Sequence, residues 1–384
     1  MEQTLPLERP DPVGPPAYDR TAGPVARVVR ADGRRAWLVT SYDLVAAGLA
    51  DRRLGLVPPG VPVDERASLF QDGPAHARLR RLVARAFTPR RIAELAPRVT
   101  ALAEAHVAAL VDADGPVDLV DVLSTPLAVG SLGLLLGVDL AEHPEFRGLV
   151  EDALRADPMA AAGDPALLAE AERAWGALTA FTAGLVAAAR EDPGEDLLSA
   201  LVAVDDADDG RLGDGELVAL VSALLAAGVI TVRGGLAVAV VHLLRTDALA
   251  GFAERTDVEG LVDELVRRLG VEVFPRWAQE DLELGGVAVA AGDEVLLRIE
   301  AANHDPARFD DPEALCPGRR GPHLGFGRGP HHCLGAALAR LEITAALTAL
   351  SRRAPGLRLA VPLAEVPWHR GEVDAGPLAL MLRT

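Results

Sequence analysis

The chain contains no lysine, so all 38 of its basic residues are arginine, and 56 acidic residues outnumber them. The formal net charge of −18 argues against a nucleic acid as a partner, because nucleic-acid binding relies on positive charge that neutralises phosphates. Only two cysteines, Cys316 and Cys333, occur in 384 residues, which is too few for a disulfide framework and suits a reducing compartment. The first residues lack the basic segment and apolar core of a signal peptide, so the sequence predicts a cytoplasmic protein.

Linkers are also lacking. After the proline-rich start, no Gly/Ser tract, charge block or internal repeat interrupts the apolar segments. Half of the residues are hydrophobic, which is sufficient for a large core. We therefore expect one domain that spans residues 1–384.

Most of the apolar segments have the periodicity of α-helices. Segments with a 3.6-residue apolar period are 74–86, 117–137, 144–156, 165–190, 194–204, 258–270 and the run from 336 to about 352. Residues 25–39, with an Asp32-Gly33 turn, and residues 282–297 have the features of short β-strands. Residues 54–72 are irregular and rich in proline, which is typical of a loop that covers a binding site. The sequence predicts a mainly α fold with small β-sheets.

Residues 217–244 form an almost wholly apolar run that is long enough to cross a membrane. Arg233 lies in the middle of this run, and no belt of Trp or Tyr flanks it, which argues against a membrane span. A helix that is apolar on every side is also typical of the centre of a large domain. We therefore predict a buried central helix and no membrane insertion.

The segment Phe326-Gly327-Arg328-Gly329-Pro330-His331-His332-Cys333-Leu334-Gly335 places a cysteine just before an apolar helical run. The dipole and free amides of a helix N-terminus favour a thiolate there. The glycines before Cys333 permit a tight turn, and Gly335 allows a flat cofactor to approach closely. A lone cysteine is usually a small buried apolar residue, but these surroundings favour a metal ligand. A zinc site is disfavoured, because the spacing of its possible ligands matches no zinc pattern; these are His323, His331, His332, Cys333 and Cys316.

This segment matches every fixed position of the signature F-G-x-G-x-H-x-C-x-G, and the chain resembles the bacterial soluble branch of the cytochrome P-450 superfamily. The resemblance implies haem b (iron protoporphyrin IX) bound through the Cys333 thiolate, between the central helix and the helix after the cysteine. A thiolate ligand pushes electron density toward the O–O bond of dioxygen, which favours oxygen activation. The implied activity is a monooxygenase that hydroxylates or epoxidises an apolar or natural-product-like molecule.

Other segments of the resemblance supply further haem-binding residues. His76 and Arg80, four residues apart on one helical face, correspond to propionate ligands of the family, as does Arg276. The full set that the resemblance assigns to the cofactor is His76, Arg80, Arg276, Phe326, His331, Cys333 and Gly335.

The resemblance also implies a structural ion pair. Glu264 and Arg267 match the family's E-x-x-R motif, whose carboxylate and guanidinium form a buried pair. A third, basic partner usually comes from the segment before the cysteine loop, and Arg319 is the candidate. Loss of one partner leaves an uncompensated buried charge, which costs roughly 3–5 kcal/mol.

One position departs from the family pattern. The family typically has an acid immediately before the alcohol of the central helix, where this chain has Ile230 before Thr231. The acid and alcohol normally feed protons to dioxygen, and Thr231 is the catalytic residue that remains. Gly228 still permits a local opening of the helix. In one interpretation, a water chain or a group of the substrate replaces the acid. In a second, the chemistry is peroxide-driven oxidation or oxidative coupling, which does not need the usual proton relay. In a third, Ile230 only improves packing.

The resemblance assigns the substrate pocket to the central helix and to several loops. Its predicted residues are Leu224, Ala227, Gly228, Ile230, Val273 and Phe274, with the segments 56–70 and 368–375. They suggest an apolar pocket for a bulky natural product or a lipid-like molecule, by analogy with the family.

No flavin or ferredoxin domain is present, so the electrons are expected from a separate ferredoxin or flavodoxin-type donor and its reductase. The arginines that cluster in two segments are Arg78, Arg80, Arg81, Arg85, Arg90 and Arg91, and then Arg319, Arg320, Arg328 and Arg340. If these share a face, an acidic donor is steered to it; the alternative is a set of solvated helix arginines. A non-enzymatic haem-fold protein that activates a partner enzyme is a third hypothesis, although such proteins tend to lose the ligand cysteine.

Overall fold

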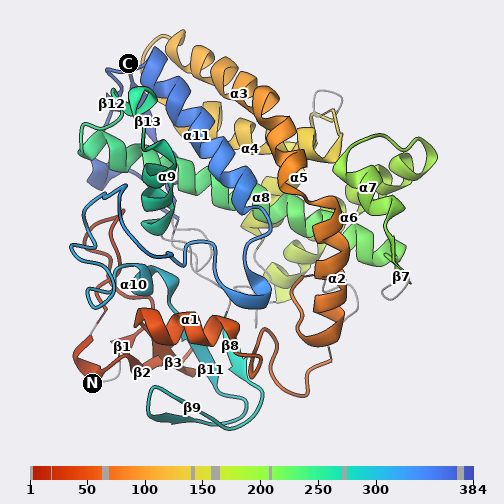
Figure 1. Cartoon of the computed structure of the whole chain (residues 1–384), viewed down its shortest axis with the longest axis vertical. Helices are drawn as coiled ribbons and strands as arrows, with labels where there is room; N and C mark the ends of the chain where they lie inside the picture. The colour runs from red at the N-terminus through yellow and green to blue at the C-terminus, as the bar shows by residue number, and fades with distance from the viewer. Residues whose placement is uncertain are drawn as a thin grey trace.

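The computed structural model describes residues 3–18, 20–62, 69–139, 143–156, 165–206, 210–269, 275–369 and 376–384 (Figure 1). The α-helices are α1 (Tyr42–Ala50), α2 (Gly73–Ala86), α3 (Pro89–Val111), α4 (Thr125–Leu136), α5 (Phe146–Arg155), α6 (Pro165–Glu191), α7 (Leu197–Ala203), α8 (Asp214–Arg245), α9 (Val258–Arg267), α10 (Ile299–Asn303) and α11 (Ala336–Arg353). The strands are β1 (Gln3–Thr4), β2 (Val25–Val29), β3 (Arg35–Val39), β4 (Leu54–Gly55), β5 (Val117–Asp118), β6 (Asp205–Asp206), β7 (Gly210–Arg211), β8 (Arg276–Ala278), β9 (Leu282–Leu284), β10 (Val287–Val289), β11 (Glu294–Leu297), β12 (Arg358–Leu359) and β13 (Met381–Arg383).

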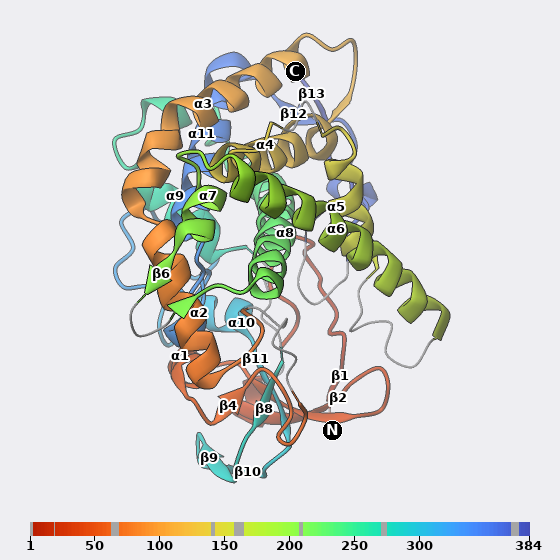
Figure 2. The ribbon, with the colours of Figure 1, turned by 90° about the vertical axis from the view of Figure 1, so that its right-hand side faces the viewer.

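The largest sheet joins strands from the first 55 residues to strands between residues 276 and 297. Its strand order is β1-β2-β3-β11-β8-β4, and β2 and β3 form the predicted antiparallel hairpin. Strand β11 pairs in parallel with β3, with Leu296 opposite Leu38. Helix α1 covers this sheet with buried side chains such as Val45 and Leu49. The sheet lies at one end of the molecule and most of the long helices lie at the other (Figures 1 and 2).

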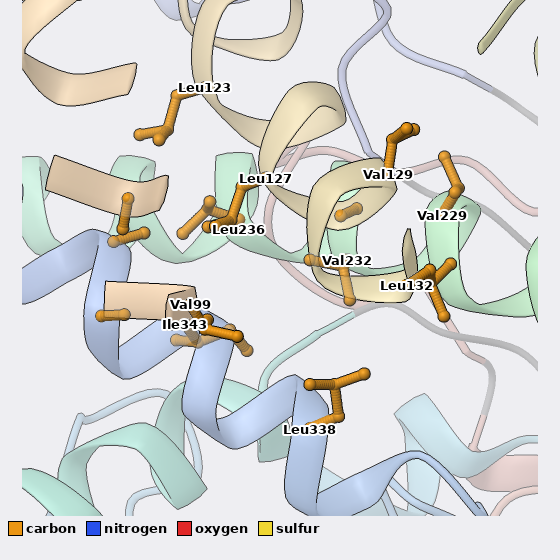
Figure 3. Close-up of a cluster of buried hydrophobic side chains, with 14 of the residues drawn as sticks. Val99, Leu123, Leu127, Val129, Leu132, Val229, Val232, Leu236, Leu338 and Ile343 are labelled. Carbon is orange, nitrogen blue, oxygen red and sulfur yellow. The ribbon is translucent and has the colours of Figure 1, made fainter. Parts of the chain in front are cut away.

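Helix α8 crosses the centre of the helical region, as Figures 1 and 2 both show. Its length and composition alone would allow a membrane crossing. However, α4, α6, α9 and α11 all pack against it, and its residues from 234 to 243 are continuously buried. Figure 3 shows side chains of α8, α4 and α11 in one apolar cluster; among those labelled are Val229, Val232, Leu236, Leu127, Leu132, Leu338 and Ile343. Helix α8 is therefore the core helix of this fold, as its composition predicts.

Two helical regions differ from the expectation. Helix α3 was not predicted, although its buried residues Ile92, Leu95 and Val99 follow a helical period and Thr88 caps it by accepting from the amide of Arg91. The segment 117–137, predicted as one helix, begins instead with strand β5 and a π-helical turn at Val120–Ser124. The carboxylate of Asp118 accepts from the amides of Val120 and Leu380, which ties this strand to the C-terminal sheet.

Candidate functional site

The loop before α11 holds Cys333 in a tight turn. Gly327 and Gly329 have φ values of +69° and +74°, a backbone region that favours glycine. A Cβ on Gly329 would lie 2.8 Å from the carbonyl oxygen of Leu49, so the loop also passes close to α1. The amide of Cys333 donates to the carbonyl of Phe326 at 2.8 Å, and α11 begins three residues later. The sulfur is therefore fixed at the start of a long helix, as predicted.

The thiol of Cys333 is both accessible and desolvated. Its side chain is exposed, yet the surrounding protein raises the pKa of the thiol by burial, although the amide of Gly335 and the guanidinium groups of Arg80 and Arg340 act in the opposite direction. Burial is the larger influence on the free thiol. Coordination to a metal ion deprotonates a thiol outright.

Polar and cationic groups from two other segments converge on the cysteine loop. The rings of His76 and His331 lie 4.2 Å apart, and Nε2 of His331 is 2.8 Å from Oδ1 of Asp72. Arg80, one turn after His76 on α2, donates to the carbonyl of His332. Arg276, at the start of β8, is close enough to Asp72 for the two charges to interact. Contacts in the structure thus connect His76, Arg80, Arg276 and His331, which the resemblance assigns to the cofactor, with the cysteine loop.

The charges of this group suit an anionic partner. Burial lowers the pKa of His76 to about 4, helped by His331 and Arg80, so its imidazole is neutral at pH 7 and can donate a hydrogen bond. Burial also lowers the pKa of Arg276, which is 3% exposed, and of Arg80. A desolvated guanidinium is stabilised by a nearby anion, and a carboxylate such as a haem propionate is an anion of this kind. Space also exists for a flat group, since a Cβ built on Gly335 would meet no atom within 4 Å.

Helix α8 carries other residues predicted for the site. Leu224, Ala227 and Thr231 recur at helical spacing, and Ala227 is exposed although the neighbouring Ala226 and Val229 are buried. These three residues therefore share one face of the helix. The hydroxyl of Thr231 lies on this face and donates to the carbonyl of Ala227 at 2.9 Å.

Gly228 has a different local role from the expected opening of the helix. Helix α8 runs as uninterrupted α-helix through this position. A Cβ on Gly228 would lie 2.8 Å from Cδ1 of Leu132, so glycine permits the close approach of α4. Ile230 is partly buried and contributes no proton donor. Val273 and Phe274, also predicted for the pocket, lie outside the described residues, as do residues 63–68 and 370–375 of the predicted pocket loops.

The predicted structural ion pair is present, with its third partner. Nε of Arg267 lies 2.9 Å from Oε1 of Glu264, and Nε of Arg319 lies 3.0 Å from Oε2. The amide of Cys316 also donates to Oε2, at 3.1 Å. Burial alone would raise the pKa of Glu264, but these donors hold it below its ordinary value. Arg267 further donates to the carbonyl of Asn303, so the cluster ties α9 to the segment that leads to the cysteine loop.

The predicted basic surface is partly neutralised within the chain. Ion pairs join Arg78 to Glu216, Arg90 to Glu94, Arg319 to Glu264 and Arg340 to Asp263. Arg80 points toward the cysteine loop. Arg320 and Arg328 are exposed. The net positive charge of this surface is therefore smaller than the count of arginines suggests.

Two carboxylates near the cysteine loop are not revealed by the sequence pattern. Asp72 orients His331, and Asp263 pairs with Arg340; neither position stands out without knowledge of the turns that bring the pairs together. A third carboxyl, Glu342, is 2% exposed within α11, and burial raises its pKa to about 8, with the hydroxyl of Ser131 acting in the opposite direction. Its acidic side chain on the apolar stripe of a predicted helix is the signal that would have revealed it.

Comparisons with known proteins agree with this geometry. A family model described as Cytochrome P450 matches residues 260–353. The chain is 38% identical to the nocardicin C N-oxygenase of Nocardia uniformis subsp. tsuyamanensis, over 94% of this chain and 92% of that protein. It is also 38% identical to the mycinamicin IV hydroxylase/epoxidase of Micromonospora griseorubida, over 93% and 91%. It is 37% identical to the cytochrome P450 monooxygenase PikC of Streptomyces venezuelae, over 97% and 91%.

Solved structures confirm the predicted fold class. The crystal structure of CYP105P1 in complex with filipin I superposes with a TM-score of 0.88 at 34% identity, covering 100% of this chain and 98% of that one. A mutant of the mixed-function P450 MycG in complex with mycinamicin V gives a TM-score of 0.87 at 34% identity, covering both chains completely. The chain therefore belongs to the cytochrome P450 family and is an oxidoreductase of the monooxygenase type, in a family of haem-thiolate enzymes that act on small molecules with electrons from redox partners.

Proposed function

We propose that this protein binds haem b through the Cys333 thiolate and inserts oxygen into an apolar, natural-product-like molecule by hydroxylation or epoxidation. One observation carries the proposal. The cysteine loop contacts His76 through His331 and Arg80 through His332. Arg276 joins this group through the charge of Asp72, which also accepts from His331. A single thiolate with convergent donors for a dianion is the arrangement that a haem with two propionates requires.

Each residue of the site has a distinct task. The thiolate of Cys333 ligates the iron, and the bound haem supplies one-electron and oxygen chemistry. Arg80, Arg276 and His331 would hold the propionates of a bound haem, together with His76, whose neutral imidazole would donate a hydrogen bond to them. Asp72 accepts from Nε2 of His331 and so fixes the orientation of that ring.

Thr231 holds the proton that the reaction needs. Its hydroxyl donates to the carbonyl of Ala227 in the structure, and a change of χ1 to another staggered rotamer would free it for a partner in the pocket. The apolar side chains around it, including Leu224 and Ile230, exclude bulk water and favour an apolar substrate. Because Ile230 carries no acid, we infer that protons reach Thr231 through water or through a polar group of the substrate.

The substrate class is inferred from relatives as well as from the pocket. Similar proteins are named for oxygenation of nocardicin C and mycinamicin IV, and similar crystal structures contain filipin I or a mycinamicin. We infer a bulky secondary metabolite for this chain. We further propose that residues 1–384 act as one cytoplasmic domain.

We propose a ferredoxin or flavodoxin-type protein, with its reductase, as the electron donor. Arg320 and Arg328 lie exposed near the cysteine loop of a protein whose net charge is −18. An acidic donor is attracted to a local basic surface on an acidic protein, and this attraction weakens as salt increases. We therefore expect the rate of reduction by the donor to fall as ionic strength rises.

The isoleucine at position 230 favours a second candidate function. A site that lacks the acid beside Thr231 is suited to peroxide-driven oxidation or to oxidative coupling, because these reactions bypass the usual delivery of protons. Turnover under labelled dioxygen separates the candidates: label in the product supports the monooxygenase, and an unlabelled coupled product, or turnover with peroxide alone, supports the alternative.

The cysteines provide a matched test of the proposal. Cys333→Ala removes the proposed ligand, whereas Cys316→Ala removes the other free cysteine. We expect extractable haem b at one equivalent and donor-dependent oxygen uptake in the wild type and in Cys316→Ala. Cys333→Ala should lose oxygen uptake and thiolate ligation. Native activity in Cys333→Ala would overturn the assignment, and a protein that binds no haem would favour a partner-activating role.

A further inference from the structure

Arg340 lies over the ring of Phe326, beside the cysteine loop. Its guanidinium carbon is 4.4 Å from the ring centroid, within the range of a cation–π interaction. Its Nε donates to Oδ1 of Asp263 at 2.8 Å, which links α11 to α9. The guanidinium is therefore held on two sides, by a carboxylate and by an aromatic face.

Phe326 is the residue whose backbone carbonyl holds the ligand cysteine. The amide of Cys333 donates to that carbonyl at 2.8 Å. The preceding residue has no freedom to shift, because a Cβ on Gly325 would lie 2.7 Å from the carbonyl oxygen of Val266 in α9. The amide of Gly325 also donates to Nδ1 of His323 at 3.0 Å. Movement of the Phe326 ring is therefore transmitted to the backbone contact at Cys333.

Arg340 belongs to a small polar cluster beside the cysteine loop. Asp263 holds the guanidinium in place, while His323 lies 3.6 Å from the same carboxylate oxygen and faces the ring of Phe326. The cluster of Asp263, Arg340, His323 and Phe326 thus surrounds the segment that carries the ligand.

We propose that Arg340 is a positioning residue for the haem ligand: clamped by Asp263, it fixes Phe326 and, through the Phe326 carbonyl, the backbone of Cys333. This inference rests on the proposed haem-thiolate function. Hydrogen bonds and charge around a ligating sulfur tune the reduction potential of its iron. Because reduction adds negative charge to the site, a nearby cation favours the reduced form, so Arg340 raises the midpoint potential.

Four variants of the holoenzyme test this role. Arg340→Gln removes charge and stacking, Arg340→Lys keeps the charge but loses the planar group, and Asp263→Asn keeps Arg340 but releases it. Arg353→Gln is the matched control, because Arg353 lies on the same helix and its Nε pairs in the same way with Glu104, at 2.6 Å. Midpoint potentials are measured with mediator dyes, so docking of a protein donor has no influence. The reduced carbon monoxide spectrum reports the ligand.

The charge and positioning effects have separate signatures. Arg340→Gln should lower the one-electron reduction equilibrium constant by about three- to tenfold, which is at most about 59 mV. Arg340→Lys should keep most of the potential, and Asp263→Asn should raise it. All three should convert more of the reduced carbon monoxide complex to the form with a neutral axial ligand, and Arg353→Gln should change neither property.

Two results overturn the inference while the proposed function stands. The first is that Arg340→Gln keeps the wild-type potential and spectrum. The second is that the spectrum changes in Arg340→Gln but not in Arg340→Lys or Asp263→Asn, which would mean that charge acts without positioning. A wild type without the thiolate spectrum would instead refute the proposed function itself. Thermal unfolding followed by circular dichroism shows whether each variant is folded.

Discussion

Replacement of Glu264 by glutamine is the sharpest test of the structural ion-pair cluster. Both carboxylate oxygens are used: Oε1 accepts from Arg267 at 2.9 Å, and Oε2 accepts from Arg267, Arg319 and the amide of Cys316 at 3.0–3.1 Å. Glutamine keeps the shape but turns one acceptor into a donor that faces an arginine. Arg267 is fully buried, so its charge remains uncompensated in the variant.

The magnitude follows from that uncompensated charge. Breaking a buried ion pair by removing one partner costs about 3–5 kcal/mol. With an unfolding entropy of about 2.1 cal/mol/K per residue, a chain of this length loses about 4–6 °C in Tm. Because the folded-state pKa of Glu264 lies below its ordinary value of 4.5, this contribution is complete above pH 4.5 and is lost as the pH falls further. The difference between wild type and variant should therefore shrink in acid.

The assay is denaturant unfolding followed by circular dichroism at pH 7 and at pH 4. Glu259→Gln is the control, since Glu259 is exposed in the first turn of the same helix and contributes at most about 1 kcal/mol through the helix dipole. A Glu264→Gln variant as stable at pH 7 as Glu259→Gln would refute the reasoning.

Three further changes have defined outcomes. Ile230→Asp should increase the fraction of oxygen consumption that appears as product, if proton delivery limits turnover; unchanged coupling would show that water or substrate already delivers protons. Glu342→Gln should stabilise the protein at pH 9 but not at pH 4. The folded-state pKa of about 8 exceeds the ordinary value of 4.5, so the wild type loses folding stability as the pH rises from 4.5 to 8. Equal effects on the free energy of unfolding at both pH values would contradict this. Gly228→Ala should lower the free energy of unfolding by about 1–3 kcal/mol through the clash with Leu132, measured by urea unfolding, and a neutral effect would show that α4 yields.

The sequence predicted the parts of this molecule that depend on local patterns. The hairpin of β2 and β3, the core helix α8 and the turn that holds Cys333 follow from alternation, apolar content and glycine placement. The pair between Glu264 and Arg267 follows from i, i+3 spacing on one helix. The convergence of His76 and His331 could be inferred only through the family resemblance, because 255 residues separate them.

What local patterns missed depends on tertiary contacts. The pairing of Asp72 with His331 and of Asp263 with Arg340 arises from helices and loops that meet only in the folded chain. The raised pKa of the Cys333 thiol has the same origin, since the helix N-terminus was visible in the sequence and the burial that outweighs it was not. Gly228 illustrates a further case: its need for glycine comes from Leu132, on another helix.

The absorbance spectrum of the purified, dithionite-reduced protein with carbon monoxide tests the central claim most directly. Thiolate ligation by Cys333 predicts a strongly red-shifted Soret band in the wild type and its loss in Cys333→Ala. A Soret band at the position typical of a neutral axial ligand in the freshly purified wild type, or no haem band at all, would contradict the assignment of Cys333 as the haem ligand.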